Sequence, residues 1–151
     1  MKTKHFKTFA AILFTAATIA TVSCKKDKED DSAKPVNAPA SIAETTWGWE
    51  DEGVETIEGQ EVHYHSTVTL TFATETTGSL SFTDTYDELP SENEEGTADF
   101  TYTYNAPSGT MTFATPMGSM AVKFTIDGNN LTMYPPDSAD PDEEPVVLTR
   151  R

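Results

Sequence analysis

The chain has 151 residues, and its 25 Asp and Glu against 10 Lys and Arg give a formal net charge of -15 at neutral pH. So acidic a surface repels phosphate groups, which makes nucleic acid and anionic lipid headgroups poor partners. The residues beyond position 40 suffice for one domain with its own core and leave no room for a second.

The first 23 residues have the three-part anatomy of a secretory signal peptide. Lys2, Lys4 and Lys7 form a positive start, and an uncharged run of mostly small and apolar residues follows from Phe9 to Ala20. This run is shorter than the roughly 20 residues that a membrane-spanning helix requires. We therefore expect a signal peptide at 1–23 that is removed on export.

The only cysteine, Cys24, follows this leader directly. Thr21-Val22-Ser23-Cys24 resembles the lipobox of bacterial lipoproteins, with Thr21 where the family usually has Leu or Val. The resemblance implies cleavage before Cys24, acylation of the cysteine by chains such as palmitate, and anchoring in the outer membrane of a Gram-negative bacterium. The alternative is an ordinary cleavage site followed by a free thiol.

Residues 24–43 contain almost no apolar side chains. Such a segment cannot bury enough surface to offset the entropy lost on ordering, so we expect a disordered acidic linker. The charged run from Lys25 to Asp31 also resembles the export signal of surface lipoproteins, which implies display on the outside of the cell.

Beyond Ser41, apolar and polar residues alternate strictly, which is the period of a half-buried strand. The clearest strand runs from Val62 to Ala73, and the others are predicted at 46–50, 80–82, 100–104, 111–113, 120–126, 131–133 and 146–150. Gly and Pro residues between these segments supply tight turns. Eight strands in simple succession predict an all-β, antiparallel up-and-down meander barrel over residues 44–151.

In a meander, alternate connections lie at opposite ends of the barrel. The connections near Gly78, Gly109 and Gly128 are short, whereas three long segments, 50–61, 84–99 and 135–145, carry most of the domain's acids. The sequence therefore predicts a tight, nearly uncharged end and an opposite mouth formed by acidic loops.

The first and last strands meet at the tight end. Val146, Leu148 and Arg150 share one face, so Arg150 is expected to point inward, where its guanidinium can lie over an indole ring. Trp47 and Arg150 stand where lipocalin-like families pack a first-strand Trp against an Arg near the chain end. The domain thus resembles small bacterial lipoproteins with a lipocalin-like barrel, which implies barrel closure by this pair.

The inward-facing positions are rich in rings. A small barrel is either filled by its own side chains or holds one ligand, and both readings remain open here. If a pocket exists near the mouth, the candidate ligand-binding residues are Tyr64, Phe72, Phe82, Tyr102, Tyr104 and Phe113.

The sequence gives little support for metal binding or catalysis. Glu61, His63 and His65 share the outer face of one strand, where solvated side chains are expected in place of a metal site. The acidic run from Asp137 to Glu144 offers oxygen ligands for calcium but lacks the EF-hand pattern. No nucleophile elbow or phosphate loop occurs, so we expect neither an enzyme nor a cofactor.

Two functions fit these expectations. The first is a membrane-anchored binding module that takes a small apolar, neutral or cationic ligand at the acidic mouth. The second is a structural or interaction lipoprotein whose filled barrel displays acidic loops to a basic partner.

Overall fold

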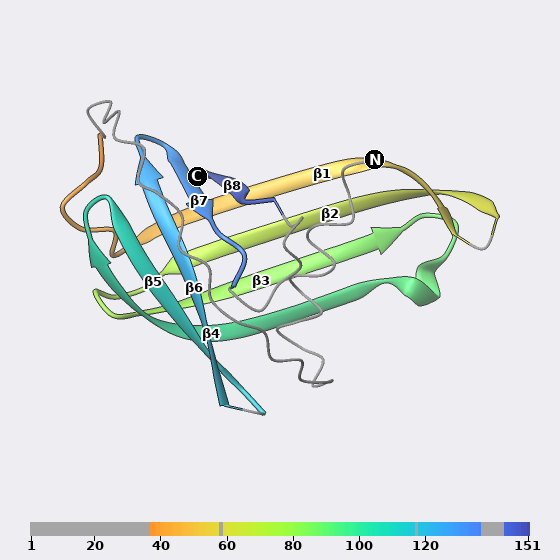
Figure 1. Ribbon diagram of the computed structural model, residues 1–151. Helices are drawn as coiled ribbons and strands as arrows, with labels where there is room; N and C mark the ends of the chain where they lie inside the picture. The colour runs from red at the N-terminus through yellow and green to blue at the C-terminus, as the bar shows by residue number, and fades with distance from the viewer. Residues whose placement is uncertain (1–36, 58, 117, 137–143) are drawn as a thin grey trace, which may run out of the picture.

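Alternating apolar and polar residues form eight antiparallel strands in the computed structural model, which describes residues 37–57, 59–116, 118–136 and 144–151 (Figure 1). The strands are β1 (Thr45–Ile57), β2 (Gln60–Phe72), β3 (Thr77–Tyr86), β4 (Glu94–Asn105), β5 (Ser108–Thr115), β6 (Gly118–Asp127), β7 (Asn130–Met133) and β8 (Val146–Arg150). Each strand pairs with the next, and β8 pairs with β1. The predicted eight-stranded up-and-down barrel is confirmed, which is consistent with the lipocalin-like resemblance.

The barrel is closed over only part of its length. β1 pairs with β2 over all 13 of its residues, but it pairs with β8 only at Trp47 and Gly48. β4 likewise pairs with β5 only from Phe100 onward. The remaining parts of β1 to β4 continue as a four-stranded sheet past the closed barrel, toward the right in Figure 1. We call this sheet, residues 49–57, 60–68, 82–86 and 94–99, the extension.

The extension overturns one prediction. Segments 50–61 and 84–99 are not long acidic loops, because most of their residues belong to β1 to β4. Their acids occupy strand positions on both faces and thereby hide the apolar alternation. The connections that remain are a tight turn before Gln60 and residues 87–93, which include the short 3-10 helix η1 (Pro90–Glu92). Of the third segment, residues 137–143 lie outside the described residues.

Large apolar side chains fill the closed part of the barrel. Phe72, at the end of β2, packs among other rings, with its ring centroid 4.7 Å from that of Tyr102 and 5.5 Å from that of Phe100. Other fully buried side chains of this core are Trp47, Leu70, Leu80, Met111, Phe113, Phe124, Leu131, Met133 and Leu148. The closed part is therefore a packed core rather than a ligand cavity.

The chain enters the barrel across its base, the end that holds the β2–β3, β4–β5 and β6–β7 turns. The side chain of Ile42 is 1% exposed and belongs to the core cluster. Backbone groups hold the segment at both ends, since Gly128 N–H donates to Asn37 O and Glu44 N–H donates to Phe72 O. Residues 37–43 are thus part of the folded domain, which corrects the predicted linker boundary at 43. Cys24 and the rest of the linker lie outside the described residues.

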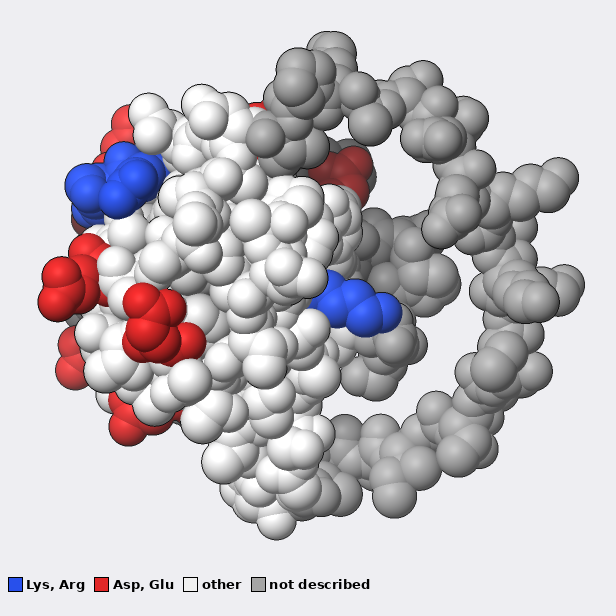
Figure 2. Space-filling view, turned by 90° about the vertical axis from the view of Figure 1, so that its left-hand side faces the viewer, with Lys and Arg blue, Asp and Glu red and all other residues white. Residues whose placement is uncertain are grey.

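Figure 2 looks onto this base. Uncharged residues cover most of the described surface in that view, and the acidic ones gather toward one side. Many of the acids instead belong to the extension and its connections, among them Asp51, Glu52, Glu55, Glu61, Asp84, Asp87, Glu88, Glu92, Glu94 and Glu95.

Candidate functional site on the inner face of the extension

A row of polar side chains crosses the extension, one from each of its four strands. Asp51 on β1 lies opposite Ser66 on β2. Ser66 in turn lies opposite Asp84 on β3, and Asp84 lies opposite Glu94 on β4. Each position has the parity of the inward-facing residues of its strand, so the four side chains share the inner face. We call these four residues the acid row.

Asp84 and Ser66 are the buried members of the acid row, and each is 4% exposed. Within the part of the chain that the structure describes, neither side chain makes a hydrogen bond or an ion pair. Burying a charged carboxylate without a partner is costly, which makes it rare in folded proteins. A buried carboxylate beside a buried hydroxyl is therefore more typical of a binding site than of a packed core.

Aromatic residues flank the acid row on both sides. Trp49 and Phe82 lie one inward-facing position nearer the base, and Tyr64 and Tyr86 lie one position farther out. The two tyrosines and Val62 form a second buried cluster, separate from the barrel core. Carboxylates attract cations through their charge, and neighbouring aromatic rings add to this attraction where a cation can lie over a ring face.

Gly53 positions Tyr64 against the acid row. The two residues are direct partners across β1 and β2, and a Cβ atom at Gly53 would lie 2.7 Å from the Tyr64 hydroxyl oxygen. The missing side chain lets the ring of Tyr64 approach β1, where its hydroxyl donates to Asp51 Oδ2 at 3.1 Å. One carboxylate of the row thus has a partner within the protein, in contrast to Asp84.

The charges of the acid row repel one another. Asp84 and Glu94 lie directly opposite, an arrangement of like charges that destabilises a sheet. The described residues contain no cluster of three metal-ligating side chains. The arrangement can pair with a cation through single carboxylates, and it disfavours an anion.

The outer face of the extension carries a different feature, a contact between His63 and Glu88. Glu88 accepts hydrogen bonds from His63 N–H and from the ring at Nδ1, both at 2.7 Å. The hydrogen bond and the charge of Glu88 raise the pKa of His63, and the same hydrogen bond lowers the pKa of Glu88. His63 is exposed, as are Glu61 and His65, so this face is solvated.

The candidate ligand-binding residues separate into two groups. Tyr64 and Phe82 flank the acid row, whereas Phe72 and Phe113 are buried in the barrel core. Tyr102 and Tyr104 lie near the base and not near the mouth, because β4 runs toward the base. Their hydroxyls donate to Thr74 O and Pro39 O, and burial raises the pKa of both tyrosines.

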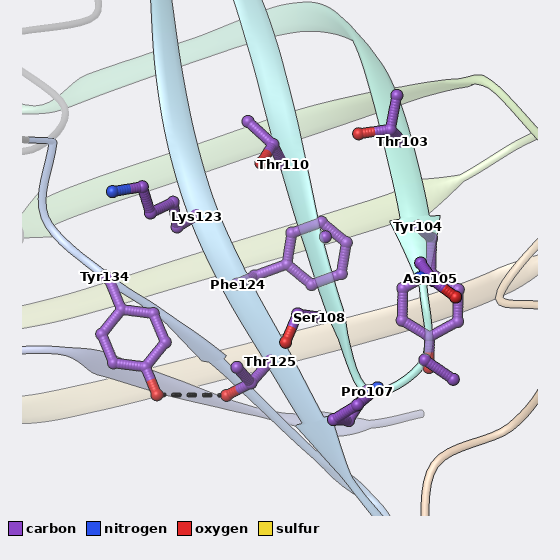
Figure 3. A pocket seen from close by; sticks show the side chains of 12 residues that line it. Thr103, Tyr104, Asn105, Pro107, Ser108, Thr110, Lys123, Phe124, Thr125 and Tyr134 are labelled. Atoms are coloured by element: carbon purple, nitrogen blue, oxygen red, sulfur yellow. Dashed lines mark hydrogen bonds between the residues drawn. The ribbon is translucent and has the colours of Figure 1, made fainter. Parts of the chain in front are cut away.

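A shallow groove of about 820 Å³ lies on the outside of the barrel, away from the acid row (Figure 3). Hydroxyl-bearing residues of β4 to β6 line it, with Tyr134 at one side and Pro107 at the β4–β5 turn. Tyr134 and Thr125 form a hydrogen bond of 3.2 Å there. The groove is open to solvent and its described lining holds no buried charge, so it is a weaker candidate than the acid row.

Trp47 and Arg150, the predicted closure pair, are direct partners between β1 and β8. The guanidinium carbon of Arg150 lies 6.0 Å from the centroid of the Trp47 ring. Because direct cross-strand partners share one face, Arg150 lies on the inward side with the fully buried Trp47, as predicted, but it is exposed because that position is at the rim. The neighbouring Arg151 forms an ion pair with Glu50.

Sequence reasoning missed the acid row. Its signal is the run Phe82-Thr83-Asp84-Thr85-Tyr86, where an acid occupies the middle of three alternating inward positions. Read as a strand, this run places a carboxylate between two inward-facing rings. Asp51 and Glu94 are then found by register, not by any motif of their own.

Among the described residues, no helix has the length and hydropathy needed to cross a membrane. Comparison of the chain with protein families, with curated proteins and with solved structures finds no match.

Proposed function

We propose that the protein is an exported, lipid-anchored binding module that takes a small ligand on the inner face of its extension. The observation that carries the proposal is the burial of Asp84 at 4% exposure with no ion pair or hydrogen bond to another described residue. A chain under selection for stability alone has no reason to keep such a group, whereas binding sites tolerate it.

The ligand class follows from the chemistry of the face. The aromatic residues on either side of the acid row favour an apolar body, and the carboxylates favour a neutral or cationic group over an anion. The closed part of the barrel does not accommodate such a guest, because its own side chains fill it. The ligand therefore lies above the barrel core, against β1 to β4.

The proposed anchor agrees with the direction of the chain. Cys24, the residue proposed to be acylated, precedes the segment at 37–44 that crosses the base. An anchor attached there leaves the extension at the opposite end, away from the lipid. This arrangement leaves the acid row facing away from the lipid.

Native mass spectrometry of the chain, purified from its host, tests the binding function. The proposal predicts a homogeneous non-covalent adduct, or a mass shift after incubation with a host metabolite extract. A clean mass before and after incubation would contradict it. Replacement of Cys24 by Ser tests the anchor separately, because the variant should leave the membrane fraction.

The packed core is the observation that favours the second function, a protein that displays acidic residues to a basic partner without binding a small ligand. That function predicts no adduct in the same experiment. It also predicts that the inner and outer acids contribute equally to partner binding, because both act only through their charge.

A further inference from the structure

We infer that the acid row recognises an organic ammonium ion and that Asp84 is its counter-ion, an inference that rests on the proposed binding function. Asp84 is the buried carboxylate of the acid row, and both polar and aromatic residues lie next to it. It is opposite Ser66 and Glu94, and it is flanked along β3 by Phe82 and Tyr86.

The hydrogen-bonding groups of the acid row indicate which functional group of a ligand would bind there. A primary ammonium carries three N–H donors and no acceptor. On the inner face, Asp84 and Ser66 present oxygen acceptors side by side, and no described residue donates to the Asp84 carboxylate. Charge-assisted hydrogen bonds from an ammonium to a carboxylate are about twice as strong as neutral ones. A hydroxyl ligand leaves the buried charge uncompensated.

The surroundings favour an organic cation over a metal ion. A bound metal needs several ligands that converge on one point, and the described residues hold no such group of three. The inner face instead offers aromatic residues on both sides of the carboxylate, which suit the hydrocarbon part of an amine. Asp51 is held by Tyr64 and Glu94 is exposed, so they add negative potential around the bound charge.

Three indoles of similar size and different charge test the inference: tryptamine, the neutral alcohol tryptophol and indole-3-acetate. Each is titrated by calorimetry into the full chain, expressed with its own leader and purified as its host processes it. We expect tryptamine to bind at least tenfold more tightly than tryptophol, and indole-3-acetate to bind more weakly than either.

Asp84→Asn and Asp99→Asn form a matched pair of variants. Both remove one negative charge from the extension, but Asp99 is exposed, on the outer face of β4. We expect Asp84→Asn to lower the affinity for tryptamine at least tenfold without changing that for tryptophol, and Asp99→Asn to lower it less than twofold. Equal losses in the two variants, tryptophol binding as tightly as tryptamine, or no binding of tryptamine would overturn the inference.

The two proposals fail in different ways. If native mass spectrometry finds an adduct whose mass identifies a neutral or anionic molecule, the protein is a binding module but the ammonium site is wrong. If no adduct forms and none of the three indoles binds, the binding function itself is wrong. Loss of the adduct in Asp84→Asn, with retention in Asp99→Asn, supports both.

Discussion

Arg150 lies over the ring of Trp47 at the seam where the barrel closes, with its guanidinium carbon 6.0 Å from the ring centroid. The seam is short, because only two residue pairs join β1 to β8. Beyond these pairs β1 continues alone with β2, and the barrel opens into the extension. The closure pair therefore marks the boundary between the packed core and the inner face that carries the acid row.

Replacement of Arg150 by Ala should cost about 0.5–1 kcal/mol, the usual size of an exposed cation–π contact. An inward, buried arginine would cost several kcal/mol, but Arg150 is exposed at the rim. Urea unfolding of the two chains measures the difference. Arg150→Lys, which keeps the charge, should lose less, and a loss above about 3 kcal/mol in the Ala variant would show that the side chain is buried after all.

Ile42→Ala should destabilise the domain by about 2–5 kcal/mol, because it removes a fully buried side chain from the base of the core. Ala40→Ser, in the same segment at an exposed position, should change stability by less than about 0.5 kcal/mol. Denaturant unfolding of both variants decides whether residues 37–43 belong to the folded domain. If both substitutions change the free energy of unfolding equally and by little, Ile42 belongs to the linker and not to the folded domain.

Much of the barrel could be predicted from the sequence, since strict alternation from Val62 to Phe72 leaves only one way to bury one face. The burial of Ile42 could not be predicted, because a single apolar residue among Ser and Ala shows no periodic pattern. The lengths of β1 and β4 could also not be predicted from the sequence. Acids on both faces of a strand remove the apolar signal, and the same composition is typical of loops.

Gly78→Ala should destabilise the barrel by about 1–3 kcal/mol through overpacking. Gly78 lies opposite Phe100, and an added Cβ would clash both with the Phe100 ring, 2.7 Å from Cε2, and with the backbone oxygen of Thr71. Ser79→Ala, one residue further on the outer face, should change stability by less than about 0.5 kcal/mol.

A double-mutant cycle identifies the cause. Phe100→Leu removes part of the ring that covers Gly78, so the two substitutions together should cost less than the sum of their separate effects. Strictly additive losses would show that the Phe100 ring does not contribute and that the backbone oxygen of Thr71 alone excludes a side chain at Gly78.

The His63–Glu88 contact should make stability depend on pH. Its carboxylate raises the pKa of His63 above the ordinary value of 6.5. A raised histidine pKa gives stability that is fully present below the unfolded value and is lost as the pH rises through the folded value. The stability difference between the wild-type protein and Glu88→Gln should therefore be larger near about pH 6 than above about pH 8.

Nuclear magnetic resonance titration of the His63 ring checks this directly. Glu88→Gln should lower the pKa of His63, whereas Glu92→Gln, in the same connection, should leave it in place. An identical titration of His63 in the wild-type chain and in Glu88→Gln would contradict the contact.

The candidate site was only partly within reach of the sequence. Tyr64 and Phe82 belong to clear apolar alternations, which predict their inward positions, whereas Asp84 interrupts such an alternation, so the sequence predicts a loop there. The register that joins Asp51, Ser66 and Asp84 depends on strand lengths that the acids themselves obscured. Only the pairing of whole strands shows that Asp51, Asp84 and Glu94 share one inner face.

The most direct test of a binding face at the acid row is the free energy of unfolding of Asp84→Asn, compared with that of Asp99→Asn in the absence of any ligand. If Asp84 is kept for binding, removal of its buried charge should stabilise the domain by about 0.5–2 kcal/mol at neutral pH, while Asp99→Asn changes stability by less than about 0.5 kcal/mol. A destabilised Asp84→Asn chain would show that Asp84 serves the fold, and would contradict the account.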